Sequence, residues 1–139
     1  PPEEEPDEEP IEEHIVEEPE PFEPTIELLE QQGNRITYTY QHDEEQIEVR
    51  VVAVTGDVWM ALYATDHNNT STTITGNKML YRERDPEVTF EVTEYQLLHF
   101  HFGNTYHAQI FINDMPIEDL HRGDSVHVYI QLDRVNQDE

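Results

Sequence analysis

The chain has 139 residues, of which 32 are acidic and 7 are basic, so its formal net charge at pH 7 is −25. This balance argues against nucleic acid and anionic membrane surfaces as direct partners, because both are bound through Lys and Arg side chains. The absence of cysteine excludes disulfides, thiol catalysis and cysteine-ligated zinc. The length fits a single domain, or a small domain with a tail.

Residues 1–34 are predicted to form a disordered acidic linker. They contain seven of the nine prolines, and residues 1–30 carry 14 of the acidic residues with no Lys or Arg. Proline stiffens the backbone and like charges repel one another, so we expect an extended, solvated segment. One short turn of helix is conceivable at 25–32, before Gly33 and Asn34. The alternative is an acidic peptide that docks on a basic partner.

From residue 35 onward, apolar and polar side chains alternate with a period of two, which is typical of half-buried strands. We expect strands at 36–40, 47–51, 58–64, 72–75, 88–92, 97–102, 106–112 and 126–130. Residues typical of turns fall at 42–45, 55–57, 66–69, 76–77, 103–104, 113–114 and 122–124. This spacing predicts an all-β fold, an antiparallel β-sandwich of about seven to nine short strands, over residues 35–135. A C-terminal tail is expected at 136–139.

The histidines are the first candidates for a functional site, with eight in the chain. His99 and His101 share one face of a predicted strand, where two imidazoles can meet a Zn²⁺ ion. His107 is the nearest third ligand, but a two-residue turn at Gly103 and Asn104 would direct it to the opposite face. The alternative, a solvent-facing stripe of polar aromatic side chains, is preferred, and we expect no metal site.

No motif in the chain predicts catalysis or a bound cofactor. Carboxylate pairs are too frequent in so acidic a chain to mark an active site. Ser71 and Ser125 are the only serines, and neither lies in a Gly-x-Ser-x-Gly nucleophile motif. Phosphate-binding glycine loops and calcium-binding loops are also absent from the sequence. We therefore expect a protein that is not an enzyme and that uses no cofactor.

Trp59 is the single tryptophan of the chain, and on a strand it is expected to anchor the core. The alternative is an exposed aromatic platform for a sugar or a peptide. The tyrosines that would assist such a platform are Tyr63, Tyr81, Tyr95 and Tyr106. The residues proposed for an interaction surface are Trp59, His99, His101 and Tyr106. The long polar loops at 66–77 and 114–124 are further candidates.

Three short motifs follow one another at a characteristic spacing. The first is a strand at 47–54 followed by Gly-Asp-Val-Trp, ending at Trp59. The second is Leu-Leu-His-Phe-His-Phe-Gly-Asn, ending at Asn104, and the third is Ile-Phe-Ile-Asn-Asp, ending at Asp114 before Met-Pro. Over about residues 36–132 they resemble the C-terminal extracytoplasmic domain of RodZ-type proteins. In that family the corresponding strands lead to Trp, to Leu-Gly-Asn and to Asn-Gly, so Asp114 stands where Gly is usual.

The resemblance implies a non-catalytic module on the outer side of the bacterial cytoplasmic membrane, tethered by one transmembrane helix upstream of this chain. The family couples the actin-like MreB cytoskeleton to cell-wall elongation and so maintains cell shape. MreB binding belongs to a cytoplasmic helix-turn-helix domain outside this chain. The implied partners of the present domain are wall-synthesis proteins or the wall itself. The alternative function is a β-sandwich that binds glycan or muropeptide.

Overall fold

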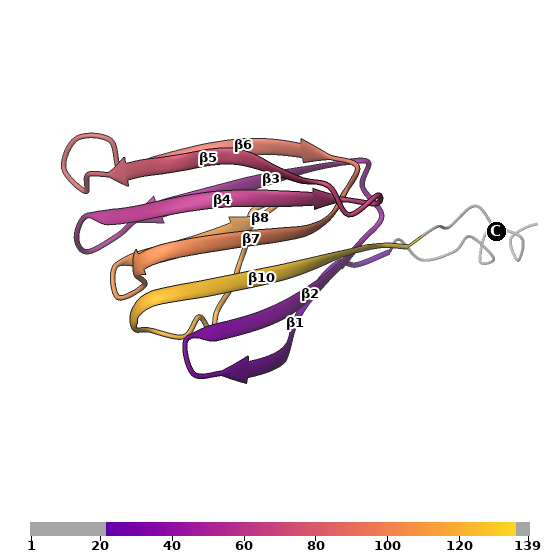
Figure 1. The fold of residues 1–139 in the computed structure, drawn as a ribbon, viewed down its shortest axis with the longest axis horizontal. Helices are drawn as coiled ribbons and strands as arrows, with labels where there is room; N and C mark the ends of the chain where they lie inside the picture. Colours follow the sequence, from indigo (N-terminus) through magenta and orange to yellow (C-terminus); the bar gives the residue numbers. More distant parts are fainter. Residues whose placement is uncertain (1–21, 136–139) are drawn as a thin grey trace, which may run out of the picture.

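The computed structural model describes residues 22–135, which form ten β-strands and no helix (Figure 1). The strands are β1 (Thr25–Gln32), β2 (Arg35–His42), β3 (Gln46–Ala53), β4 (Val58–Asp66), β5 (Ser71–Leu80), β6 (Glu87–Thr93), β7 (Tyr95–Asn104), β8 (Ala108–Ile112), β9 (Met115–Pro116) and β10 (Asp124–Arg134). The predicted all-β class is confirmed, with β1 and the two-residue β9 in addition to the expected strands. The predictions for 1–21 and 136–139 lie outside the described residues.

The strands form two sheets that pack face to face as a sandwich. Sheet A has six strands in the order β1-β2-β10-β7-β4-β5, and sheet B has four in the order β6-β3-β8-β9. In the view of Figure 1, β3, β6 and β8 of sheet B lie behind the broader sheet A. Because side chains alternate along a strand, each sheet directs one set inward and one set to solvent.

A single hydrophobic core joins the two sheets. Tyr40, Leu62 and Phe100 of sheet A are fully buried in it, as are Val49 and Ile110 of sheet B. Along β2, β3 and β7, buried side chains mostly alternate with more exposed ones. This is the pattern that predicted the strands. Full burial of one such aliphatic or Phe side chain contributes about 1.5–3 kcal/mol, so this core is the main source of stability.

The segment at 25–32 is strand β1, so the predicted linker extends too far and its helical turn does not form. β1 pairs antiparallel with β2 through a two-residue turn at Gly33 and Asn34, in which Gly33 has φ = +60°. Most side chains of β1 are exposed, and only Ile26 packs against the core. Backbone pairing with β2, rather than burial, makes this segment a strand, and the hydrophobic pattern therefore gave no signal for it.

One pair of strands departs from the expected antiparallel arrangement. The last strand, β10, lies between β2 and β7, and it runs parallel to β2 and antiparallel to β7. A parallel pair requires a long connection between its strands, and here the rest of the domain supplies it. The sheets are therefore antiparallel except at the β2–β10 pair, and this pair brings the beginning and the end of the domain together.

Two of the predicted turns lie inside strands. Gly76 and Asn77 belong to β5, and Gly103 and Asn104 belong to the end of β7. The chain then crosses to sheet B instead of folding back as a hairpin, so β7 and β8 do not pair. The turn predicted at 113–114 is confirmed, and its residues Asn113 and Asp114 have φ of 50° and 68°.

Candidate interaction surface

The outer face of sheet A gathers six aromatic or imidazole rings from its three central strands. We call these rings the aromatic stripe: Trp59 and Tyr63 of β4, His99 and His101 of β7, and His127 and Tyr129 of β10. The strand register brings them together, since His99 lies opposite both Tyr63 and Tyr129, and His101 lies opposite His127. All six are half-buried, so they lie on the surface and not in the core.

The rings of the stripe stack on one another across the strands. The ring centroids of His101 and His127 are 4.1 Å apart with planes 11° from parallel, and those of His99 and Tyr129 are 4.3 Å apart at 12°. These separations are close to the spacing of neighbouring strands, so the stacked rings stand upright on the sheet. Upright rings present their edges to solvent, and their faces are already occupied by neighbours.

Trp59 lies on this outer face, so the expectation that it anchors the core is wrong. Its ring meets His101 edge to face at 5.2 Å, and its indole N–H donates to the side-chain oxygen of Asn77. It lies across Gly103, where an added Cβ would be 3.5 Å from the Trp59 Cβ. The run at 58–62 is apolar at every position, so alternation alone did not reveal which side faces the core.

Tyr106 does not join the stripe. It lies in the loop between β7 and β8 and is 55% exposed. Of the other tyrosines considered beside Trp59, Tyr63 is in the stripe, Tyr95 packs against the core, and Tyr81 carries the guanidinium of Arg84 over its ring at 4.3 Å. Of the four residues predicted for the interaction surface, Trp59, His99 and His101 therefore share the outer face of sheet A, and Tyr106 does not.

Within the stripe, His127 shares a hydrogen bond with His99 and stacks on the ring of His101. These contacts do not form a metal site. His99 Nε2 and His127 Nδ1 are 2.9 Å apart and share a hydrogen bond. His107 lies elsewhere, with its Nδ1 2.8 Å from Thr55 Oγ1. Within residues 22–135, no group of three or more His, Asp or Glu side chains is arranged to hold a metal ion.

Burial and mutual repulsion keep the buried part of the stripe uncharged. The pKa of His99 is lowered from 6.5 to about 4, chiefly by desolvation and then by the nearby His127, His101 and Arg35 in that order. The pKa of His127 is also lowered, chiefly by desolvation and then by His101 and Arg35. Both rings are therefore neutral near pH 7, and each acts as one hydrogen-bond donor and one acceptor.

A serine and a histidine approach each other at the end of the stripe without forming a catalytic pair. Ser125 Oγ is 3.4 Å from His101 Nε2, which is longer than the usual hydrogen bond of a hydroxyl group. A catalytic histidine is normally oriented by a carboxylate or amide on its second nitrogen. Among the described residues, no such group bonds to the His101 ring; its neighbours are the rings of Trp59 and His127.

Among the residues that the structure describes, the centre of the outer face of sheet A carries no carboxylate. Its outward residues on β2, β10, β7 and β4 are Arg35, Thr37, Thr39, His127, Tyr129, Gln131, Leu97, His99, His101, Gly103, Trp59, Ala61, Tyr63 and Thr65. The acidic side chains placed on this face by residues 22–135 lie at its borders, with Glu27 and Glu30 on β1 and Asp133 near the end of β10. Within the described part of the chain, this separation marks the face as chemically distinct.

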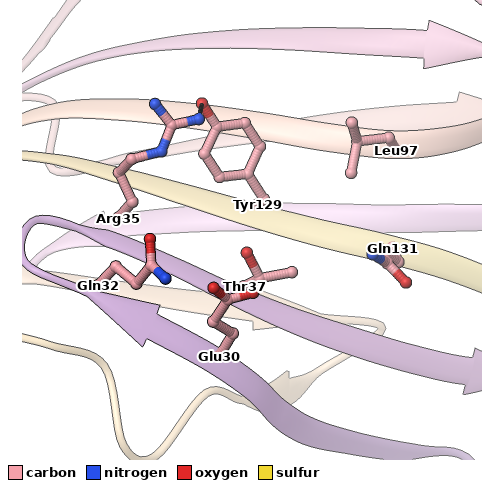
Figure 2. Close-up of a pocket in the computed structure, with 7 residues that line it drawn as sticks. All are labelled: Glu30, Gln32, Arg35, Thr37, Leu97, Tyr129 and Gln131. Atoms are coloured by element: carbon pink, nitrogen blue, oxygen red, sulfur yellow. Dashed lines mark hydrogen bonds between the residues drawn. The ribbon is translucent and has the colours of Figure 1, made fainter.

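A groove of about 320 Å³ continues the stripe toward β1 (Figure 2). We call it the Arg35 groove, and its lining residues are Glu30, Gln32, Arg35, Thr37, Leu97, Tyr129 and Gln131. Arg35 donates to the Tyr129 hydroxyl at 2.9 Å and lies 5.0 Å from the centre of its ring. A second hollow of about 430 Å³ shares Leu97 and Gln131 with the groove, so the concave region extends along the face.

Sequence reasoning singled out Trp59, His99 and His101 but missed the partners that complete the surface. His127 and Tyr129 follow the same alternation as their strand neighbours, so their common face was readable from the sequence. Their position beside β7 was not, because β10 is distant from β7 along the chain and Arg35 is more distant still. The pairing of β10 with β7 and β2 brings His127, Tyr129 and Arg35 beside His99 and His101.

Comparison of the chain with protein-family models, with curated proteins and with solved structures finds no match. Within residues 22–135 there is also no helix with the length and hydropathy needed to span a membrane.

Proposed function

We propose that this domain is a non-catalytic interaction module that binds a protein partner through the aromatic stripe. The observation that carries the proposal is the gathering of Trp59, Tyr63 and Tyr129, with Arg35 beside them, on a face whose centre has no carboxylate from residues 22–135. Trp, Tyr and Arg are the residues most enriched among those that dominate protein interfaces, whereas Asp, Glu and Lys are depleted there. A face of this composition is suited to burial by a partner.

The stacked arrangement of the rings favours a protein partner over a sugar. A sugar ring packs on an open aromatic face, but Tyr129 has His99 stacked on it and the guanidinium of Arg35 over its ring. Upright rings whose faces are already stacked fit a partner whose side chains pack against the exposed ring edges. Trp59 meets His101 edge to face, and no ring of the described residues is stacked parallel on it.

The resemblance to RodZ-type proteins supplies a cellular role for such a module. We propose that the domain lies outside the bacterial cytoplasmic membrane, tethered through a segment upstream, and meets wall-synthesis proteins in a system that links MreB to wall elongation. Two local features support the resemblance. Trp59 and Gly103, which belong to different motifs, are in contact. Asp114, at the position where the family usually has Gly, has φ of 68°, which Gly adopts at little cost.

The test substitutes two side chains of the stripe in the source organism and measures cell width. Trp59→Ala combined with Tyr129→Ala should change cell width as much as deletion of residues 22–135 does, because both remove the contact surface. Phe111→Ala, on the outer face of sheet B, is the matched control and should leave cell width normal. Circular dichroism of the purified variants confirms that they fold. Normal cell dimensions in the deletion strain would remove the support for this role.

Binding of a neutral glycan or muropeptide is the second candidate, favoured by the absence of a parallel-stacked ring on Trp59 among the described residues and by the amide and hydroxyl groups of the adjoining grooves. Trp59 is the only tryptophan, so its fluorescence reports on this face alone. Quenching or a shift of the emission by millimolar wall fragments supports glycan binding. Emission that does not change with these fragments excludes Trp59 as a sugar platform.

A further inference from the structure

The guanidinium of Arg35 is held in position at the end of the aromatic stripe. It donates a hydrogen bond to the Tyr129 hydroxyl at 2.9 Å and lies 5.0 Å from the centre of the same ring. Tyr129 is itself held by His99, with ring centroids 4.3 Å apart. A guanidinium has five N–H donors, so this single bond leaves most of them for a ligand. The cation is therefore oriented in advance of binding.

Arg35 differs from Arg50, Arg82 and Arg122 in what it contacts, whereas Arg84 resembles it in lying over a tyrosine ring. Arg50 lies within 3.8 Å of Glu87 and 3.6 Å of Asp114, and Arg122 donates to backbone carbonyls at Thr105 and Ala108. Among residues 22–135, no carboxylate lies within 4.0 Å of the Arg35 guanidinium nitrogens. Because it lines a groove and has no carboxylate at that distance among the described residues, the oriented Arg35 guanidinium is available to an external anionic group.

The opposite wall of the Arg35 groove carries a carboxylate. Glu30 of β1 lies across from Thr37, and Gln32 lies across from Arg35, so Glu30 and Arg35 are diagonal neighbours on one face. Diagonal residues of paired strands are separated by roughly 7–8 Å. Both side chains line the same groove without forming an ion pair, and Figure 2 shows them on either side of Gln32 and Thr37. A small ligand can thus lie between the two charges.

We propose that the Arg35 groove binds a small zwitterion of the amino-acid or short-peptide class. Its carboxylate contacts the Arg35 guanidinium, whose planar fork suits a carboxylate, and its ammonium contacts Glu30. Thr37, Gln32 and Gln131 offer hydrogen bonds to the amide group of a peptide, and Leu97 offers an apolar contact. The net charge of −25 repels an anion but not a ligand whose charges cancel. This inference rests on the proposed function, because it names a small ligand that the proposed interaction module takes beside the stripe.

The test is an NMR titration of the full ¹⁵N-labelled chain with alanylalanine and, separately, with free alanine. The side-chain amide signals of Gln32 and Gln131 and the Nε–H signal of Arg35 report directly on the groove. We expect saturable shifts of these signals, and the tighter of the two ligands identifies whether the site takes a dipeptide or a single residue. No shift of these signals at millimolar ligand overturns the proposal.

Capped ligands and charge variants test each contact separately. Amidation of the carboxylate or acetylation of the amine should each weaken binding about tenfold, since each removes one charge-assisted hydrogen bond. Arg35→Gln should make the protein insensitive to amidation, and Glu30→Gln should make it insensitive to acetylation. Arg84→Gln is the matched control, because Arg84 also lies over a tyrosine ring but far from the groove residues in the sheet order. Equal binding of capped and uncapped ligands would contradict the proposal.

The two proposals fail in different ways. If the dipeptide does not bind while the Trp59 and Tyr129 substitutions still change cell width, only the zwitterion site is wrong. If the dipeptide binds with the expected dependence on Arg35 while cell width is unaffected by the stripe substitutions, the groove is a small-molecule site and the proposed function is wrong.

Discussion

The outer faces of sheets A and B have the same backbone geometry but opposite chemistry. On sheet B, Arg50 lies between Glu87 and Asp114 and over the ring of Phe111 at 4.1 Å. On sheet A, Arg35 lies over Tyr129 with no carboxylate within ion-pair distance among the described residues. Arg50 on sheet B thus has carboxylate partners, whereas Arg35 on sheet A is oriented by a tyrosine and has no carboxylate partner among residues 22–135.

The residue pairs that face each other across neighbouring strands also differ between the outer faces of sheets A and B. Glu48 and Glu91 lie directly opposite each other on sheet B, a like-charge pair that is unfavourable in isolation. Gln46 reduces the effect by donating to Glu91 at 2.9 Å. The corresponding pairs on sheet A are stacked rings such as His101 and His127. A solvated face tolerates such repulsion, while the stacked rings of the aromatic stripe carry no like charges opposite one another near pH 7, which suits burial by a partner.

The largest effect should come from the core on which both faces depend. Phe100→Ala removes a fully buried ring and should lower the free energy of unfolding by about 3–5 kcal/mol. His101→Ala, one residue later and on the outer face, is the control and should cost about 1 kcal/mol. Urea denaturation followed by circular dichroism measures both. Equal losses would mean that the stripe contributes as much to stability as the core does.

Acid should destabilise the protein by protonating His99 on the outer face of sheet A. The pKa of His99 is about 4 when folded and 6.5 when unfolded, so the unfolded chain binds more protons between these values. The stability is therefore complete above pH 6.5 and falls as the pH decreases toward 4. After allowance for solvent screening, the loss is about 1–2 kcal/mol. Unfolding curves measured across this window provide the test.

A substitution on each face isolates the His99 contribution. His99→Phe keeps an aromatic ring without a titratable group, and it should flatten the slope of stability against pH over this window. Phe111→Leu changes the outer face of sheet B and should leave the slope as in the wild type. A wild-type slope in the His99 variant would show that other groups cause the acid sensitivity.

The stacked rings should show measurable coupling. A double-mutant cycle with His99→Ala and Tyr129→Ala should give a coupling energy of about 0.5–1.5 kcal/mol, the usual value for a stacked pair. The corresponding cycle for Arg50 and Phe111 on sheet B tests a cation over a ring at a partly exposed site, where about 0.5–1 kcal/mol is expected. A coupling near zero for the first pair would mean that the stacking is incidental.

The smallest effect is expected for the ion pairs of sheet B. Arg50→Gln should reduce the free energy of unfolding by less than about 1 kcal/mol, because its partners Glu87 and Asp114 are well exposed and exposed pairs are weak. The loss should shrink further in high salt, which screens surface charges. Thermal unfolding at low and high ionic strength measures it. A loss that is independent of salt would point to the contact with Phe111 instead.

Much of the fold follows from local pattern. The alternation at 36–40, 47–51, 88–92 and 126–130 lies within β2, β3, β6 and β10, because a strand with one buried face requires apolar residues at every second position. The turn at Asn113 and Asp114 followed from residue types that tolerate positive φ. The alternation did not predict β1, because most side chains of this edge strand are exposed and its backbone pairing with β2 leaves no hydrophobic pattern in the sequence.

By itself, the sequence determined an all-β domain after an acidic segment, and it placed His99 and His101 on one face of a strand. Only the tertiary structure decided that Trp59 lies on that same face, since the apolar run at 58–62 fits either side of a sheet. It also decided that His127, Tyr129 and Arg35 complete the surface. These residues meet through the pairing of β10 with β7 and β2, and pairing between strands distant in the chain depends on the whole core, not on the local pattern of any one strand.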